Sequence, residues 1–150
     1  MANTYSCLHY HFVFSTKNRE CWISAQIEHR IWAYLGGIAK ENKMVPIQIG
    51  GVEDHVHLLL AASPTLAPSK IAQLIKGRSS AWIHEVFPEM RAFAWQDGYG
   101  AFSVSRSNIP EVVDYIKKQR EHHRAHTFQE EYVRFLTKHG VAYDERYLWD

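Results

Sequence analysis

The chain has few cysteines and no long hydrophobic run, and each absence excludes a class of protein. Its 150 residues contain two cysteines, Cys7 and Cys21, which are too far apart for a CxxC pair. Neither a disulfide framework nor a thiolate zinc site is therefore supported. No apolar run of about eighteen residues and no basic segment followed by an apolar one is present, so we expect neither a membrane span nor a signal peptide. These absences favour a cytoplasmic protein with reduced cysteines.

An excess of charge of one sign is also missing. The formal net charge is +1, which excludes a uniformly basic nucleic-acid coat but leaves room for a local basic groove. Basic residues do cluster, at Lys17 with Arg19 and within segments 70–78 and 117–124, although each cluster is equally typical of a solvated surface. The length is that of one domain, which can bury its own core without disulfides or a structural metal.

Histidine is abundant, and one pair of histidines stands out. His55 and His57 lie in the segment Asp54-His55-Val56-His57-Leu58-Leu59-Leu60, which predicts a strand. Side chains alternate along a strand, so both rings point to the same face about 6–7 Å apart along the backbone. That spacing suits two ligands of one metal ion. Among ten histidines such a pair also arises by chance, and for the similar pair His9 and His11 we favour a partly buried or phosphate-facing role over metal binding.

Hydrophobic periodicity predicts alternating strands and helices. Signals for the start of a helix stand at Ser24, at Asn108 with Pro110 and Glu111, and at Thr127 with Glu130. The two middle strands are separated by the short turn Glu53-Asp54 and should form a hairpin. We expect strands at residues 5–15, 45–52, 54–60 and 95–105, and helices at residues 25–42, 69–87, 109–123 and 127–139.

The helix expected at residues 109–123 carries a second set of chemically active side chains. Tyr115 and Gln119 lie one turn apart on the same face as Val112 and Ile116. If this face meets the histidine strand, two imidazoles and an amide oxygen can hold a divalent cation beside the phenol. A cation that polarises a phosphodiester would allow the phenol to attack phosphorus and form a phosphotyrosine. The alternative is a tyrosine that packs its ring and exposes its hydroxyl to water.

Two further segments contain side chains suited to single-stranded nucleic acid. Lys76, Arg78 and Ser79 surround a glycine in the helix expected at 69–87 and can bind phosphates. Trp95 and Tyr99 can stack on unpaired bases. Without further information, an exposed helix face and a pair of core aromatics explain these residues equally well or better.

Together these segments resemble one family. His55-Val56-His57 on a strand, followed by Tyr115-Ile116-Lys117-Lys118-Gln119 on a later helix, is similar to the HUH-superfamily single-tyrosine transposases of the insertion-sequence 200/605 type, including their REP-associated relatives. The resemblance extends over residues 5–124. It includes Tyr10-His11-Phe12-Val13-Phe14, the turn Lys17-Asn18-Arg19 and the helix segment Lys76-Gly77-Arg78-Ser79.

The resemblance implies a fold, a reaction and a set of partners. The fold would be α+β, a ferredoxin-like βαββαβα unit with an antiparallel sheet. Mg²⁺ or Mn²⁺ would be held by His55, His57 and Gln119, and Tyr115 would be the nucleophile. The substrate would be single-stranded DNA with a nearby hairpin, and two chains would form a homodimer in which each site takes its tyrosine helix from the partner. The protein would act in the cytoplasm, at the nucleoid of a bacterium or archaeon. The expected DNA-binding residues are Lys17, Arg19, Lys76, Arg78, Ser79, Trp95 and Tyr99.

The chain departs from compact family members after the tyrosine helix. We expect residues 1–126 to form the transposase domain, and residues 127–150 to form a helix and an apolar tail packed on that domain. His122, His123 and His126 are expected near the site, as ligands, as proton carriers or as part of a solvated helix end. Two alternative functions stay open: a hairpin-binding protein with little catalysis, and a metal-dependent hydrolase in which Tyr115 is structural.

Overall fold

The computed structural model describes residues 3–150 and contains the predicted succession of strands and helices. From β1 to α3 the order is βαββαβα, which confirms the α+β, ferredoxin-like expectation. The elements are β1 (His9–Ser15), α1 (Glu28–Glu41), β2 (Val45–Val52), β3 (His55–Ala61), α2 (Pro68–Val86), β4 (Gly100–Ser103), α3 (Ile109–Lys117), α4 (Gln119–His122) and α5 (Phe128–Lys138). Short 3-10 turns lie at Lys17–Arg19, Pro88–Met90 and Arg106–Asn108.

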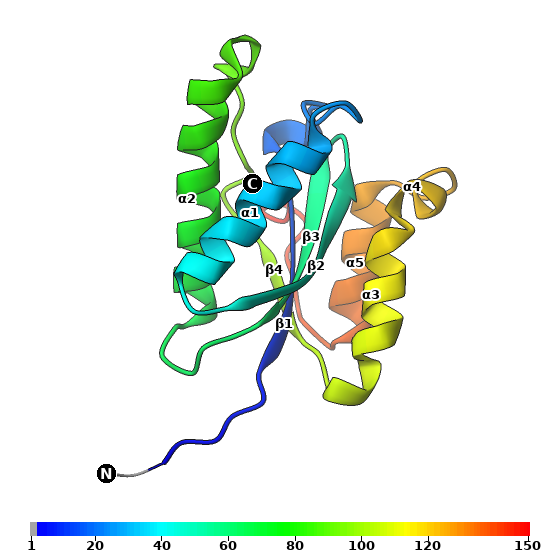
Figure 1. Ribbon diagram of the computed structural model, residues 1–150. Helices are drawn as coiled ribbons and strands as arrows, with labels where there is room; N and C mark the ends of the chain where they lie inside the picture. The colour runs from blue at the N-terminus through cyan, green and yellow to red at the C-terminus, as the bar shows by residue number, and fades with distance from the viewer. Residues whose placement is uncertain (1–2) are drawn as a thin grey trace.

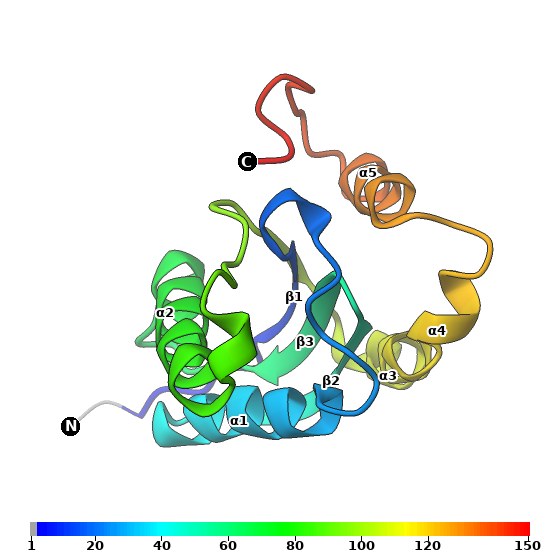
Figure 2. The same ribbon diagram turned by 90° about the horizontal axis from the view of Figure 1, so that it is seen from above.

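The four strands form one antiparallel sheet in the order β2-β3-β1-β4. Helices α1 and α2 cover one face, and α3, α4 and α5 follow one another around the other face (Figures 1 and 2). Alternation along the strands sends Phe12 and Leu58 into the core beneath α1 and α2. Val13 points the opposite way and packs against α5. The sheet therefore separates a mainly hydrophobic core from a second layer that contains several buried polar side chains.

The histidine strand lies in the middle of this sheet. β3 pairs with β1 on one side and β2 on the other, with Val13 opposite His57 and Ser15 opposite His55. A strand flanked on both edges and covered on both faces is removed from water, and the side chains of His55 and His57 have no exposed surface. Both rings point to the face covered by α3, α4 and α5, as the period of two predicts.

Several boundaries differ from the predictions. β1 begins at His9 and not at residue 5, because its partner β3 ends at Ala61, opposite His9, and Tyr5 is left 88% exposed. α1 begins at Glu28 and not at residue 25, because the carbonyl of Ser24 first accepts the N–H groups of Ile27 and Glu28 in a turn. Residues 95–99, with their aromatics and glycines, form the irregular entry to the last strand, and β4 itself begins at Gly100.

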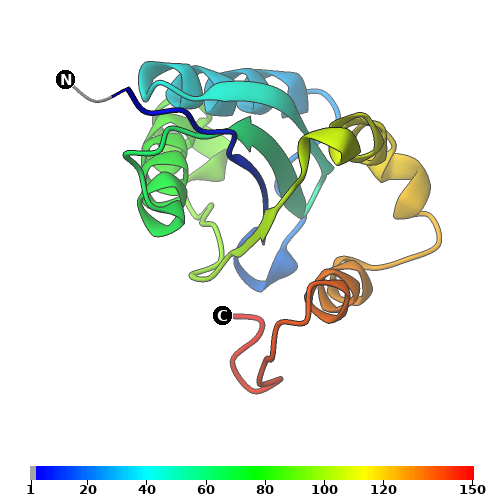
Figure 3. The same cartoon turned by 90° about the horizontal axis from the view of Figure 1, so that it is seen from below.

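The helix expected at residues 109–123 is divided in two. Lys118 leaves helical backbone geometry at φ −99° and ψ 24°, so α3 ends at Lys117 and α4 begins at Gln119. Thr127 accepts the backbone N–H of Glu130, as the capping pattern predicts, and α5 follows. Seen from below (Figure 3), α5 leads into the C-terminal tail beside the sheet. Within residues 3–150, no helix combines the length and the apolar character needed to cross a bilayer.

Candidate active site

His55 is held by a carboxylate on one ring nitrogen and faces oxygen atoms with the other. Its Nδ1 donates to Asp54 Oδ1 at 2.7 Å. Its Nε2 lies 3.0 Å from Gln119 Oε1 and 3.3 Å from Glu131 Oε1. When the proton of a neutral ring is on Nδ1, Nε2 carries a lone pair, and here that lone pair faces two oxygen acceptors. This contact is unfavourable unless a proton or a cation lies between the nitrogen and the oxygens. Burial opposes the charged ring, but hydrogen bonds to Asp54 and Glu131 raise the pKa of His55 to about 9.

His57 has a comparable arrangement, with a histidine as its supporting partner. Its Nδ1 lies 2.8 Å from His11 Nε2, and its Nε2 lies 2.9 Å from Glu131 Oε1. Burial lowers the pKa of His57 and that of His11. Neutral imidazoles are the form that binds metal, and a hydrogen bond at the far nitrogen fixes the ring for ligation. His11 is itself buried, at 2% exposed, and contacts the far nitrogen of His57.

Tyr115 and Gln119 converge with the two histidines inside one chain. The Tyr115 ring lies 5.7 Å from the His57 ring, measured between centroids, and Gln119 is buried at 1% exposed. The Tyr115 hydroxyl donates to Glu131 Oε2. Burial and the negative charge of Glu131 raise the pKa of Tyr115, so the phenol is protonated at neutral pH. The four side chains predicted to form one site, those of His55, His57, Tyr115 and Gln119, are therefore neighbours in space.

The structure adds Glu131 of α5, a residue that the sequence analysis did not consider. Its side chain is 4% exposed and lies between the two histidines and the phenol. Burial opposes ionisation, but the surrounding histidines hold the pKa of Glu131 well below its usual range. A sequence signal existed, because Glu131 falls on the apolar stripe of α5 between Phe128 and Phe135. A carboxylate on an apolar stripe needs a buried partner.

The donor atoms fit a divalent cation. His55 Nε2, His57 Nε2, and carboxylate and amide oxygens from Glu131 and Gln119 surround one point, with the measured separations between neighbouring donors from 2.9 to 3.3 Å. Neighbouring ligands of an octahedral ion bound at about 2.1 Å lie about 3 Å apart. The ligand atoms of His55, His57 and Glu131 all lie within 4.8 Å of one another. Two imidazoles with oxygen ligands suit Mn²⁺ or Mg²⁺, and zinc also accepts them.

Of the three histidines expected near the site, His123 comes closest. Its Nε2 lies 3.2 Å from Glu131 Oε2, and its Nδ1 donates to the backbone carbonyl of His126 at 2.7 Å. The His122 ring stacks on Tyr115 with centroids 4.6 Å apart. His126 lies 3.5 Å from Glu130, away from the ligand atoms. His123 and His122 thus support Glu131 and Tyr115 from the side of α4.

The predicted DNA-binding residues do not all face solvent. Ser79 and Trp95 are buried at 1% and 6% exposed, and the Trp95 indole N–H donates to Ser79 Oγ at 2.9 Å. Both side chains pack in the core, so their burial does not support the predicted contact with DNA. Lys76 Nζ donates to the carbonyls of Gln96 and Gly98, both at 2.6 Å, and lies over the Phe14 ring.

The other predicted contacts are accessible. Lys17 and Arg78 are exposed, and Arg78 pairs with Glu41 at 3.2 Å. Arg19 is half-buried and lies over the Trp149 ring at 5.5 Å, and Tyr99 is half-buried. Within the described residues, none of these four side chains contacts His55 or His57. They stay predictions for the path of the DNA away from the reaction centre.

Replacing Lys76 by methionine is expected to lower the free energy of unfolding by about 1–3 kcal/mol, because carbonyls of the 96–98 loop lose their donor. Burial lowers the pKa of Lys76 to about 8, in agreement with a structural position. Chemical denaturation checks this. Lys70→Met, on the exposed side of the same helix, should change the stability by less than about 0.5 kcal/mol. A stable Lys76→Met variant with weakened DNA binding would contradict the structural role.

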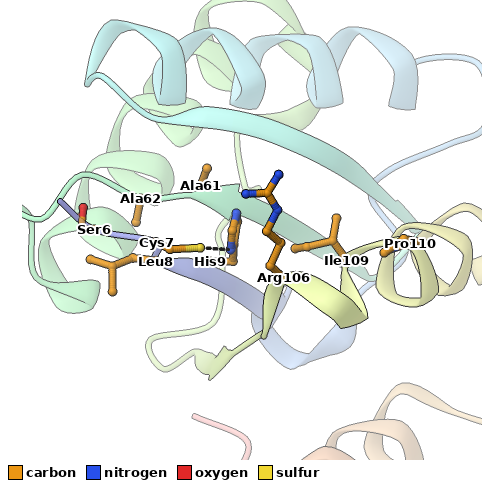
Figure 4. Close-up of a pocket in the computed structure, with 9 residues that line it drawn as sticks. All are labelled: Ser6, Cys7, Leu8, His9, Ala61, Ala62, Arg106, Ile109 and Pro110. Atoms are coloured by element: carbon orange, nitrogen blue, oxygen red, sulfur yellow. Dashed lines mark hydrogen bonds between the residues drawn. The ribbon is translucent and has the colours of Figure 1, made fainter.

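Two cavities differ in their relation to the site. One of about 520 Å³ lies where β1 begins, at the opposite end of β3 from His55 (Figure 4). Arg106 and His9 project toward it, and Cys7 Sγ lies 3.8 Å from His9 Nδ1. The other, of about 180 Å³, lies between α3 and α5 and has Tyr115 in its wall. Only the second cavity is therefore placed to admit a reactant to the phenol.

Comparison with protein families and curated proteins points to transposases. A family model described as "Transposase IS200 like" matches residues 4–119. The ISDra2 transposase TnpA of Deinococcus radiodurans is 26% identical over 119 residues, which cover 76% of this chain and 85% of that protein. The transposase for insertion sequence element IS200 of Salmonella typhimurium is 28% identical over 127 residues, which cover 81% of this chain and 82% of that protein.

Two solved structures share the fold. A candidate transposase from Deinococcus radiodurans R1 aligns with a TM-score of 0.65 at 24% identity and covers 79% of this chain and 96% of its own. A REP-associated tyrosine transposase bound to a REP hairpin aligns with a TM-score of 0.60 at 13% identity and covers 82% and 73%. The family match ends at Gln119, so it includes both predicted histidine ligands and Tyr115 and leaves α5 outside.

Proposed function

The chain belongs to the IS200-like transposase family, and we propose that it cleaves single-stranded DNA through Tyr115 and transfers the cleaved strand to another DNA end. One observation carries this proposal: the Tyr115 phenol lies beside the imidazoles of His55 and His57 within a single chain. A phenol, two imidazoles and an amide oxygen are the groups that metal-assisted attack on a phosphodiester requires.

His55, His57 and Gln119 would hold Mg²⁺ or Mn²⁺, and Glu131 would complete the ligand set from α5. The bound ion would draw electron density from the scissile phosphate and offset the charge that develops on it. Asp54 and His11 would keep the two imidazoles turned toward the ligand position. Six side chains from β1, the β2–β3 turn, β3, α4 and α5 would thus fix a single ion position.

Tyr115 would act as the nucleophile. Its oxygen would form a bond to phosphorus, and its proton would pass to Glu131 Oε2, the atom that already accepts it. The bond from phosphorus to the 3′-oxygen would break, and the departing 3′-oxygen would take up a proton from water. The products would be a 5′-phosphotyrosine and a free 3′-hydroxyl. Because the phosphotyrosine keeps the energy of the broken ester, a second 3′-hydroxyl can reverse the reaction without ATP. This reversibility separates strand transfer from hydrolysis.

The proposed partner is single-stranded DNA next to a hairpin, which is supported by the fold shared with a REP-associated transposase bound to a REP hairpin. We also propose a homodimer that works on DNA in the cytoplasm, at the nucleoid. Tyr115 meets the histidines of its own chain. One chain therefore contains a complete set of reacting groups, and the dimer would serve to hold two DNA ends near each other.

The proposal is tested by incubating the wild-type protein with a library of hairpin-bearing single-stranded oligonucleotides and Mn²⁺. A fraction of the protein should gain the mass of a DNA fragment and migrate more slowly on a denaturing gel. If no oligonucleotide in the library yields such a band while several bind, the chain is a DNA-binding protein with little catalysis.

Replacing Glu131 by glutamine is expected to weaken Mn²⁺ binding about tenfold or more, because the only carboxylate among the four donor residues loses its charge. Electron paramagnetic resonance of free Mn²⁺ measures this without DNA. Glu130→Gln, one residue away on the exposed side of α5, is the matched control and should bind Mn²⁺ as the wild type does. If Glu131→Gln binds Mn²⁺ as the wild type does and forms the adduct faster, Glu131 is not a metal ligand and only blocks the Tyr115 hydroxyl.

A further inference from the structure

The cavity between α3 and α5 has Tyr115, the proposed nucleophile, in its wall. It has a volume of about 180 Å³, and its wall includes Tyr115 from α3 and Phe135 from α5. Its inner end is His11 of β1, which is buried and lies 2.8 Å from His57 Nδ1. A DNA strand whose phosphorus reaches the Tyr115 oxygen must place a neighbouring nucleotide close by, and this cavity is lined by Tyr115 itself.

The cavity combines an apolar interior with a basic rim. Val112 and Phe135 supply apolar surface, and the Phe135 ring is fixed by edge-on contact with Tyr115, with centroids 5.7 Å apart. Arg134 and Lys138 stand one turn apart on α5, both exposed at the rim. Neither forms an ion pair with another residue in the described part of the chain. Glu111 on the α3 side offsets one of the two positive charges.

The cavity on the other side of the histidines is less suited to a phosphate. It has a volume of about 620 Å³ and is lined by Arg19 and Arg124 but also by Glu53 and Asp54. These carboxylates cancel the two cations, and Asp54 is already bonded to His55. Charge therefore favours the α3–α5 cavity as the place for a nucleotide.

We propose that the α3–α5 cavity binds the nucleotide next to the scissile phosphate, with its base against Phe135 and Val112 and its phosphate between Arg134 and Lys138. The proposal rests on the proposed function and adds a substrate contact on α5, outside the residues matched by the family model. The Phe135 ring also packs against Phe102 and His139, so the base would meet its remaining apolar surface together with Val112, a contact that accepts any base. Arg and Lys bind phosphate oxygens through charge-assisted hydrogen bonds. This site positions the strand without reading its sequence.

The test uses a fluorescein-labelled 20-residue oligo-dT and the full-length chain in EDTA, so that neither cleavage nor adduct formation contributes. Fluorescence anisotropy is expected to show a dissociation constant about tenfold higher for the Arg134→Ala/Lys138→Ala variant than for the wild type. The slope of log affinity against log salt should fall by about 1 to 2. Lys40→Ala/Arg91→Ala removes the same charge from α1 and from the turn after α2, and should change the dissociation constant less than about twofold.

A second variant separates cavity filling from charge. Val112→Trp places a large ring in the cavity and keeps both cations. It should weaken oligo-dT binding about fivefold with an unchanged salt slope. The circular dichroism of each variant should match that of the wild type. The cavity proposal is overturned if Arg134→Ala/Lys138→Ala weakens binding no more than the control Lys40→Ala/Arg91→Ala does. It is also overturned if Val112→Trp binds oligo-dT as the wild type does.

The outcome also distinguishes this proposal from the proposed function. A wild-type chain that binds oligo-dT and forms the phosphotyrosine adduct, but whose cavity variants bind normally, overturns only the nucleotide site. A wild-type chain that binds no oligonucleotide overturns both proposals.

Discussion

Replacing Tyr115 by phenylalanine is expected to abolish the covalent protein–DNA adduct, reducing its rate of formation by at least about 1,000-fold. The change removes one oxygen atom, the one that would bond to phosphorus. The ring would keep its contacts with His57 and His122, so the fold and the DNA affinity should stay within about twofold of the wild type. Denaturing gels measure the adduct, and anisotropy measures binding. Tyr147→Phe, in the exposed tail, is the matched control and should form the adduct normally.

Two results of this experiment would favour other functions. Should Tyr115→Phe still cleave DNA at nearly the wild-type rate, water is the nucleophile and the chain is a metal-dependent hydrolase. Should the wild type bind hairpin DNA and neither cleave it nor form an adduct, the chain is a binding protein.

The second large effect is expected at the centre of the sheet. Replacing His57 by alanine should weaken Mn²⁺ binding at least about 100-fold, because one of two nitrogen ligands is lost and His11 loses the ring that it supports. The melting temperature offers a readout independent of catalysis. Mn²⁺ binds only the folded protein in this scheme, so saturating Mn²⁺ should raise the melting temperature of the wild type but not of His57→Ala.

His29→Ala provides the control, since His29 is exposed on α1, on the other face of the sheet. It should bind Mn²⁺ and respond to it as the wild type does. If His57→Ala keeps full Mn²⁺ affinity, the ligand site lies elsewhere and the metal-assisted mechanism loses its basis.

The fold was predictable because strand periodicity and turn signals were unambiguous in the middle of the chain. The hairpin of β2 and β3 and the shared orientation of His55 and His57 follow from a period of two and a two-residue turn. Element ends were less predictable, since they depend on partners. β1 begins at His9, opposite the last residue of β3, and this boundary cannot be read from the aromatic residues around Tyr5.

The candidate site was predictable only in part, and the reason is tertiary packing. The convergence of Tyr115 and Gln119 with the histidines follows from helix periodicity once the helix faces β3. The carboxylate of the site, Glu131, comes from a helix whose position over the sheet no local pattern reveals. For the same reason Lys76 and Trp95 were predicted as DNA contacts. In the sequence, a lysine that binds loop carbonyls looks like an exposed lysine, and a core tryptophan looks like an exposed tryptophan.

The most direct measurement is to locate the DNA on the protein after reaction. The wild-type chain, a reactive hairpin oligonucleotide and Mn²⁺ would be incubated, digested with nuclease and trypsin, and examined by tandem mass spectrometry. A nucleotide attached through phosphate to the oxygen of Tyr115 is the predicted result. Attachment at any other residue, or cleaved DNA with every tyrosine unmodified, would contradict the proposal that this phenol is the nucleophile.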